Sequence, residues 1–400
     1  MYYLGVDWAT EKHDLCLVDE AGSVIQNLEI KQTQAGFKQF EKLVTCYGAA
    51  NIRINIERSD GLLVDWMLAQ RWAVYVTPPV VVAHRRPRRS KSDLSDAYLL
   101  AHLLHLRDPD CRPLTRSSAT VLHLRELARA LDSTVIDQRR LANRLSYLLY
   151  QYFPIANYLF AHVECLICLA FLDSFPTPQQ ARELTSYKLK QFLKKQNYKN
   201  MYRVDEIYML LQTPMPTAIA SEGYVAQVKI IIPFLRQLHY TRSHLERELP
   251  KLFKTHPEAG WWKSFPGTKG PLTPARLLAW IGDDRKRFPD AETLQAVAGT
   301  APVTRRSGKA LSVEFRRACS HPLRKAMDDF ARQSVRYSAW AREYRDEQVR
   351  RGHNMARVYR ALANRWAKII WTLWQRGELY DETKHVSNRN HQGVRQLKVI

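Results

Sequence analysis

The first 115 residues alternate strand-like runs with helical segments. Apolar residues fall at every second position in residues 51–57, as in a half-buried strand, and at helical spacing in residues 36–47. By the same criteria we expect strands at residues 2–7, 14–18, 23–30 and 73–77, and helices at residues 62–71 and 92–106. A basic loop at residues 85–91 precedes the last of these helices. This order predicts a mixed α/β sheet covered by helices.

From residue 121 onward the pattern changes to a heptad repeat. Ten residues, nine of them mainly apolar and one polar, follow one another at alternating spacings of three and four positions. They are Val121, Leu124, Ala128, Leu131, Val135, Gln138, Ala142, Leu145, Leu149 and Tyr152. A repeat sustained over more than four heptads is typical of a coiled coil. The repeat fits either self-association or a long helix packed within one chain, and we favour self-association.

The remainder of the chain has a mainly helical pattern. Residues 154–218 and 223–253 are expected to be helical, with breaks at prolines that include Pro233 and Pro250. A Gly-rich turn at residues 265–271 opens a further helix, as in helix-hairpin-helix modules that present backbone N–H groups to DNA phosphates. Residues 303–309 then lead into helices that reach about residue 375. The fold class is therefore α/β plus all-α.

The charge of the chain points to a polyanionic partner. Its 400 residues include 61 Lys and Arg against 39 Asp and Glu, a formal net charge of +22. Nucleic acid is the simplest partner, although a membrane surface or a purely solubilising role would also use such charge. Between residues 305 and 376 there are 18 basic residues and six acidic ones. Six aromatic residues lie among them and are expected to be mostly core: Trp340, Tyr344, Tyr359, Trp366, Trp371 and Trp374.

Cysteine usage and hydropathy favour the cytoplasm. The six cysteines are scattered through a long chain, as reduced thiols are, and the pair Cys165 and Cys168 lies in an apolar run that predicts buried helical thiols. No stretch reaches the roughly 18 to 20 apolar residues that a membrane span needs, and residues 1–7 do not form a signal peptide. We therefore expect no membrane partner.

Four carboxylates fall where two strands end and a helix begins. Asp7 and Glu57 end predicted strands, while Asp93 and Asp96 share one face at a helix start because they are three residues apart. Such hard oxygen donors suit Mg²⁺ or Mn²⁺ and permit two-metal phosphoryl transfer. Taken singly, each acid is more simply a surface residue or a helix-dipole partner. Other nearby acids could also substitute: Glu11, Asp14, Asp60 and Asp65.

The motifs around these carboxylates resemble one known family. In order along the chain they are Gly5-Val-Asp7, Ile56-Glu57, Lys91-Ser-Asp-Leu-Ser-Asp-Ala97, Pro266-Gly-Thr-Lys-Gly-Pro271, Phe288-Pro289 with Ala298-Gly299, and Arg306-Ser-Gly308. The chain is similar in these motifs to the DEDD-type insertion-sequence transposases, the bridge-RNA-guided recombinases. The resemblance covers nearly all of residues 1–376 and leaves the tail uncovered, and residues 154–255 are longer than the family pattern leads us to expect.

The resemblance implies a fold and an activity. It implies a RuvC-like, ribonuclease-H-type domain at residues 1–115, a helical coiled-coil region at 116–255, a transposase domain at 256–376 and a polar tail at 377–400. Asp7, Glu57, Asp93 and Asp96 would be the metal ligands, and Ser307 would be the nucleophile that becomes covalently attached to a cut DNA strand. The enzyme would then be a bacterial, cytoplasmic DNA recombinase that moves its own insertion element.

The resemblance also implies partners. A structured non-coding guide RNA would pair with target and donor DNA, and the protein would act as a dimer or tetramer, with an active site that protomers could share. Basic residues near the motifs are expected to contact nucleic-acid backbones: Arg85, Arg86, Arg88, Arg89, Lys91, Lys269, Arg305, Arg306, Lys309, Arg316 and Arg317.

Two other functions remain compatible with the residues alone. A RuvC-like junction resolvase would hydrolyse DNA with the carboxylates and without Ser307. A non-catalytic nucleic-acid-binding protein would keep the fold and cut nothing. Loss of strand exchange on removal of Ser307 would separate the recombinase from the resolvase, and metal-dependent cleavage would exclude the binding protein.

Overall fold

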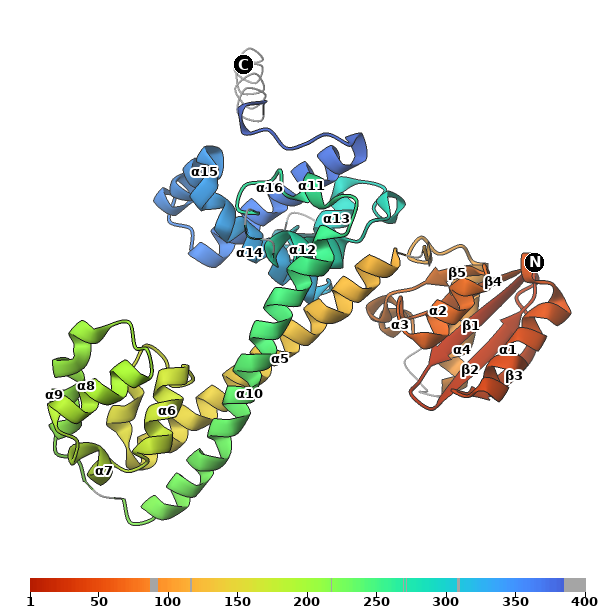
Figure 1. The fold of residues 1–400 in the computed structure, drawn as a ribbon. Coiled ribbons are helices and arrows are strands. Elements are labelled where there is room, and N and C mark those ends of the chain that lie inside the picture. The colour runs from red at the N-terminus through yellow and green to blue at the C-terminus, as the bar shows by residue number, and fades with distance from the viewer. Residues whose placement is uncertain are drawn as a thin grey trace. The chain divides into compact units, whose positions relative to one another are not determined.

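The chain divides into two compact units. The computed structural model describes residues 1–86, 93–115, 117–216, 218–268, 270, 272–307 and 310–384, without the side chains of residues 80, 93–95, 305–307, 310 and 311. Unit 1 contains Met1–Ser118 together with Asp283–Pro289, and unit 2 contains Ala119–Gly282 with Asp290–Ile400. The result is a small mixed α/β unit and a mostly helical one (Figure 1).

Unit 1 is built on a six-stranded sheet with the order β3-β2-β1-β4-β5-β6. Its strands are β1 (Tyr2–Trp8), β2 (Lys12–Val18), β3 (Val24–Lys31), β4 (Ile52–Ile56), β5 (Ala73–Val76) and β6 (Arg112–Pro113). β1, β4 and β5 run parallel, whereas β2, β3 and β6 each run antiparallel to a neighbour. The five strands expected from the sequence are all present, and β6 is an addition.

Helices cover both faces of this sheet. Helices α1 (Gln34–Tyr47) and α2 (Leu62–Ala69) share a core with alternate residues of the strands, such as Leu4 and Val6 of β1 and Ile54 of β4. On the other face α4 (Asp93–His105) packs its Ala97 and Ala101 against Cys16 and Val18 of β2. Because side chains alternate along a strand, Gly5, Asp7 and Asn55 lie on the α4 face.

The backbone of α4 lies directly on β1 at Gly5. A Cβ atom built on Gly5 would overlap the carbonyl oxygen of Ala97 and lie 2.5 Å from the amide nitrogen of Ala101. Any larger residue at position 5 would therefore push helix and strand apart. Glycine here is required by this close approach, since its backbone has an ordinary strand conformation.

One helix of unit 1 was not expected from the sequence. Helix α3 (Pro79–Arg85) begins at the second of two prolines that the pattern indicates only as the end of a strand. Proline is favoured in the first turn of a helix because its missing N–H would have no intrahelical partner there. The helix ends at Arg85, where the basic loop was expected to begin, and residues 87–92 of that loop lie outside the described residues.

The heptad repeat forms α5 (Ala119–Tyr152), which packs along α10 (Ser221–Lys254) of the same chain (Figure 1). Tyr152 stacks on Tyr224, and Gln138 bonds to His239, so the two helices run antiparallel. The seam is thus covered within the chain and does not need a second copy. One predicted seam residue is wrong: Thr134 is buried where Val135 was expected, because a straight helix drifts from a strict heptad.

Helix α10 continues through both prolines at which breaks were predicted. Pro233 and Pro250 lie inside it, so the expected interruptions are wrong. A proline inside a helix costs about 3 kcal/mol through its lost hydrogen bond and its ring. Burial of Ile231, Ile232 and Leu235 around the first proline offsets this cost, because these residues belong to the core that α10 shares with α5.

A cluster of short helices shares that core. It contains α6 (Leu166–Ser174), α7 (Pro178–Arg182), α8 (Ser186–Lys195) and α9 (Val204–Gln212). Their buried residues, Leu169, Leu189 and Ile207 among them, pack with the last turns of α5 and the first half of α10. Cys168 is buried in α6 and Cys165 immediately precedes that helix, and both thiols are free.

The C-terminal part of unit 2 surrounds an aromatic core. It consists of α11 (Ala259–Trp262), α12 (Leu272–Ile281), α13 (Ala291–Val297), β7 (Val303–Ser307), β8 (Ala310–Glu314), α14 (His321–Tyr337), α15 (Ala339–Arg350) and α16 (Met355–Arg376). Trp340, Tyr344, Trp366 and Trp374 are buried, which confirms that most of the aromatic residues of this region are core. None of the helices in the described ranges is long and apolar enough to cross a membrane.

The strands β7 and β8 correct the expectation that helices follow residue 309 directly. They form an antiparallel hairpin in which Val303 pairs with Glu314 and Ser307 pairs with Ala310. Only residues 308 and 309 separate the paired ends, and a glycine in a two-residue connection between alternating apolar positions is a hairpin signal. The short length of each strand and the two adjacent arginines of β7 obscured that signal.

Gly5→Ala is expected to destabilise unit 1 by about 3 kcal/mol, because the new methyl group would overlap the α4 backbone. Urea denaturation of the full-length variant measures the loss. Gly223→Ala in α10 is the control, since nothing lies within 4 Å of its added Cβ atom. The control is expected to be neutral or stabilising by up to about 1 kcal/mol, and equal stability of both variants would contradict the close approach.

Candidate active site

Asp7 and Glu57 lie side by side at the carboxyl ends of two parallel strands. In the register of β1 and β4, Val6 pairs with Ile56, so the next residue of each strand is an acid. Both side chains are partly buried. Asp7 shares its face of the sheet with Gly5, and Glu57 shares it with Asn55. The strand ends thus present two carboxylates on the face that α4 covers.

The direction of α4 brings its first turn to the same edge. The rings of Tyr3 and His105 lie 5.2 Å apart, and Gly5 contacts Ala97 and Ala101, so α4 runs antiparallel to β1. Two strand residues span about 6.6 Å and one helical turn about 5.4 Å. One further turn toward the start of α4 therefore corresponds to the position of Asp7, and that turn begins at Asp93.

Asp96 is held by an arginine from the basic segment. It is buried, with 6% of its surface exposed, and its carboxylate accepts two bonds from Arg86. The Nε atom of Arg86 lies 2.7 Å from one oxygen, and its Nη2 atom donates to the other. This bidentate geometry fixes both side chains. A carboxylate so engaged keeps free lone pairs, because its two oxygens offer about four acceptor positions.

The pKa of Glu57 indicates that anionic groups lie close together at this site. Burial raises the pKa of Glu57 above its ordinary value, and the nearby Asp96 carboxylate raises it further. The guanidinium groups of Arg86 and Arg58 oppose that rise. Like charges in one partly buried site repel unless a cation neutralises them. A divalent cation with oxygen ligands fits this donor set, since all the candidate ligands are carboxylates.

The described side chains do not by themselves complete a metal site. Among side chains that the structure describes, no group of three His, Cys, Asp or Glu residues is placed to hold a metal ion. The side chain of Asp93 lies outside the described residues. Asp14 is an additional acid at this edge, because it pairs with Asp7 across β1 and β2 and is 9% exposed. From the sequence alone Asp14 was expected only as a possible substitute ligand.

A buried polar network beneath the acids fixes α4 to the sheet. Asn55 donates its side-chain amide to the carbonyl oxygen of Leu100 at 2.8 Å, and its own oxygen accepts from the hydroxyl of Thr77 at 3.0 Å. The Thr77 hydroxyl also lies 3.2 Å from the Cys111 sulfur atom. Sequence reasoning missed Asn55, although a polar residue between isoleucines in a strand with both faces covered is a usable signal.

The basic residues expected to bind nucleic acid have several different environments. Arg85 pairs with Asp108 at 3.1 Å, Arg86 holds Asp96, Arg316 donates to the Ala301 carbonyl oxygen, and Arg317 is exposed. The backbones of Arg305, Arg306 and Ser307 belong to β7, and their side chains are not described. The remaining candidates lie outside the described residues: Arg88, Arg89, Lys91, Lys269 and Lys309.

The Gly-rich turn before α12 is packed, at its described residues, against α14. Gly267 has a left-handed φ of 81°, and a Cβ atom there would lie 3.1 Å from Cβ of Gln333. Thr268 is fully buried and bonds to the Phe265 carbonyl oxygen. The described part of this turn therefore serves packing, and its role toward DNA phosphate stays a prediction.

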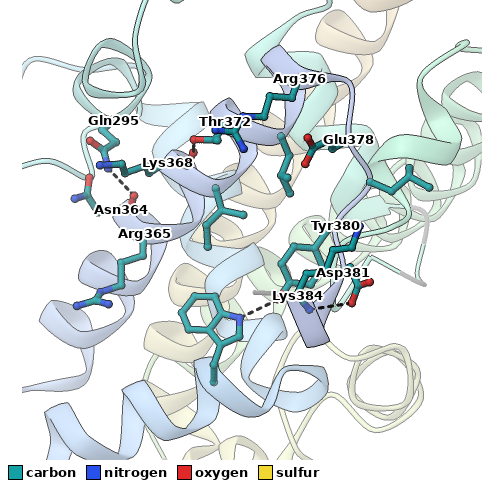
Figure 2. Close-up of a pocket in the computed structure, with 14 residues that line it drawn as sticks. Gln295, Asn364, Arg365, Lys368, Thr372, Arg376, Glu378, Tyr380, Asp381 and Lys384 are labelled. Atoms are coloured by element: carbon teal, nitrogen blue, oxygen red, sulfur yellow. Dashed lines mark hydrogen bonds between the residues drawn. The ribbon is translucent and has the colours of Figure 1, made fainter. Parts of the chain in front are cut away.

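Unit 2 also contains a pocket of about 620 Å³ beside α16 (Figure 2). Basic side chains of α16, including Arg365 and Lys368, line it together with Glu378 and Asp381 of the following segment. Trp340 and Tyr380 also line it, and the Trp340 indole nitrogen donates to the Tyr380 hydroxyl at 2.9 Å. Charges of both signs line this pocket.

Two protein-family models match the chain. A DEDD-type IS110 transposase model matches residues 4–154, which include Asp7, Glu57, Asp93 and Asp96. A second model, for transposases of the IS116/IS110/IS902 family, matches residues 262–346 and includes Ser307. Residues 155–261 lie outside both.

Curated relatives extend the similarity over nearly the whole chain. A Streptomyces coelicolor protein named as the mini-circle transposase for IS117 is 30% identical, with 96% of each chain covered. The 43.6 kDa protein of insertion element IS110 from the same species is 23% identical, with 95% of each chain covered. The 42 kDa protein of insertion element IS900 from Mycobacterium paratuberculosis is 22% identical over 94% of this chain and 96% of its own.

Asn55→Ala is expected to destabilise unit 1 by about 2 kcal/mol, because it removes the buried hydrogen bonds to Leu100 of α4 and to Thr77, which follows β5. Denaturant unfolding of the full chain measures this loss. Asn27→Ala is the matched control, since Asn27 is an exposed residue of β3 in the same sheet. Equal stability of the two variants would show that the network does not hold α4.

Proposed function

Because this chain belongs to the IS110/IS116 family of transposases, we propose that it cuts and rejoins DNA with a carboxylate-bound metal and a serine nucleophile. The observation that carries this proposal is the convergence of the β1 and β4 ends with the first turn of α4. The sheet order and the mixture of parallel and antiparallel strands support a RuvC-like, ribonuclease-H-type domain. The transposase family itself implies DNA cleavage and recombination.

Asp7, Glu57, Asp93 and Asp96 are the proposed ligands of Mg²⁺ or Mn²⁺. Bound there, the cation supplies a Lewis acid that favours the reactive form of the attacking oxygen and stabilises charge on the leaving oxygen. Glu57 supplies a carboxylate whose repulsion from Asp96 is relieved on binding. Arg86 orients Asp96 and limits its movement. Asn55 keeps α4, and with it Asp93 and Asp96, at the correct distance from the strand ends.

Ser307 is the proposed nucleophile. Its hydroxyl oxygen forms a bond to the phosphorus of one DNA strand, its proton passes to solvent, and the bond from phosphorus to the leaving sugar oxygen breaks. That sugar oxygen takes up a proton, and reversal of the step with a new sugar hydroxyl rejoins the strand. The Ser307 backbone lies at the end of β7. The two-residue connection to β8 keeps Ser307 near the hairpin tip. The neighbouring arginines of β7 could offset charge on the phosphate.

Guidance by a structured RNA and action as a dimer or tetramer belong to the same proposal. The net charge of +22 suits a protein that holds both RNA and DNA backbones, while base pairing reads the sequence. The carboxylates belong to unit 1 and Ser307 to unit 2, and the proposal requires both to act on one DNA strand.

Asp7→Asn and Glu57→Gln should each reduce DNA cleavage by on the order of 100-fold or more, because each removes a metal ligand from the transition state. Cleavage is measured with purified protein, element DNA, its flanking RNA and Mg²⁺. EDTA should abolish it and added Mn²⁺ restore it. Glu20→Gln, which removes an acid with 79% of its side chain exposed, should cleave normally. Metal-independent cleavage would refute the proposed chemistry.

Ser307→Ala should abolish both strand exchange and the covalent protein–DNA adduct, which denaturing gels detect. Ser312→Ala is the matched control, because Ser312 is an exposed serine on the other strand of the same hairpin. The control should form the adduct normally. If Ser307→Ala still cuts DNA in the presence of Mg²⁺, the serine role is wrong and the resolvase function gains support. If neither wild type nor control cuts, the protein only binds.

A further inference from the structure

A small basic pocket lies beside the β7–β8 hairpin. It has a volume of about 270 Å³ and is lined by residues of α14, α16 and Phe315, which directly follows β8. The charged residues among its lining are Arg324, Lys325, Asp328, Arg332 and Arg360. Asp328 is the one carboxylate among the residues that line it, so positive charge is in clear excess.

Two of these arginines, from α14 and α16, stack on one aromatic ring. The guanidinium carbon atoms of Arg324 and Arg360 lie 4.3 and 4.2 Å from the centre of the Phe315 ring. Phe315 itself is 43% exposed. Cation–π contacts hold a guanidinium group in a fixed plane and leave its N–H edges available to a further ligand. The ring thus positions two cationic groups that come from different helices.

The charges of this pocket are not balanced within the described protein. Asp328 accepts from Arg332 at 3.2 Å, and Lys325 pairs with Asp132 at 2.8 Å. No carboxylate of the described residues forms an ion pair with Arg324 or Arg360. The Nη2 atom of Arg324 donates to the Arg316 carbonyl oxygen, whereas its buried Nε atom has no hydrogen-bond partner among the described residues.

The positive charges of Arg324 and Arg360 also repel each other. Burial lowers the pKa of Arg360, and the positive charge of Arg324 lowers it further, while Asp328 acts in the opposite sense. Holding two cations close together costs electrostatic free energy, which the cation–π contacts with Phe315 and the charge of Asp328 offset only in part. An oxyanion with several acceptor oxygens could accept from the exposed N–H groups of both guanidinium groups.

The position of the pocket suggests the source of that anion. In the hairpin register Val303 pairs with Glu314 and Ser307 with Ala310, so about 14 Å of strand separates the Ser307 backbone from the hairpin base. Phe315 follows Glu314 at that base. A DNA strand advances about 3.4 Å per nucleotide along its axis, so a strand lying along the hairpin would pass this pocket roughly four nucleotides from the bond attacked.

We propose that Arg324 and Arg360, clamped on Phe315, bind one backbone phosphate of the DNA strand that Ser307 attacks. This inference rests on the proposed function for the identity of the strand. The bound phosphate would anchor the strand while the hairpin tip reaches the scissile bond. Because the contact is to a phosphate, it would be independent of base sequence.

Arg360→Gln tests the contact by DNA binding alone, without Mg²⁺ and without cleavage. Full-length protein is titrated with a labelled duplex carrying the element end, over a series of salt concentrations. The affinity should fall by on the order of tenfold, and the slope of log Kd against log salt should become shallower by about one. Arg360→Lys should recover the slope but only part of the affinity, since lysine cannot make a bidentate contact.

Arg365→Gln is the matched control. Arg365 lies on the same helix, stacks 4.3 Å from the centre of the Tyr344 ring and faces the other pocket (Figure 2). Its substitution removes the same charge and should leave the slope within error of wild type. If both variants reduce the slope equally, the effect is that of general charge and the pocket is refuted. If Arg360→Gln weakened binding to the guide RNA and left binding to DNA unchanged, the assignment to DNA would likewise be overturned.

Uncharged methylphosphonates placed singly along the strand locate the contact. One position within a few nucleotides of the cut should weaken binding to wild type and have no further effect on Arg360→Gln. Additive losses at every position would contradict the proposal. Adduct formation by wild-type protein is scored separately, so failure of the serine chemistry and failure of this phosphate contact give different results.

Discussion

The close approach of α4 to β1 at Gly5 determines the rest of unit 1. Where a helix backbone lies on a strand without an intervening side chain, the helix has little freedom to slide or tilt. The start of α4 is therefore fixed relative to the ends of β1 and β4. The hydrogen bond from Asn55 to Leu100 adds a second point of attachment. With these two contacts in place, acids from three separate segments share one edge of the sheet.

A group of acids in unit 1 and a pair of arginines in unit 2 each keep like charges close together. In unit 1, burial raises the pKa of Glu57, Arg86 lowers it and the Asp96 carboxylate raises it. In unit 2, Arg324 and Arg360 flank Phe315 without a carboxylate partner among the described residues. Each arrangement keeps like charges close together in the isolated protein. Both are explained if a divalent cation and a nucleic-acid phosphate complete them, which are the two components that phosphoryl transfer on DNA requires.

Sequence periodicity predicted the local elements well and the long-range contacts poorly. Alternating apolar residues located β1 to β5, and the acids at two strand ends followed directly from that pattern. The bond from Arg86 to Asp96 could not be predicted, because it depends on how a loop returns to the helix. Helix α10 passes through Pro233 because burial outweighs local preference. The pairing of Arg324 with Arg360 joins residues 36 positions apart, and only the tertiary fold reveals it. The metal ligands, Ser307 and the domain boundaries at residues 115, 255 and 376 remain predictions.

The central claim is that four carboxylates at this sheet edge share a divalent cation. The most direct measurement is the anomalous scattering of Mn²⁺ in crystals of the protein grown with that ion. The account predicts an anomalous peak enclosed by the carboxylates of Asp7, Glu57, Asp93 and Asp96. Well-ordered side chains at these four positions with no peak between them, in crystals that bind Mn²⁺ elsewhere, would contradict it.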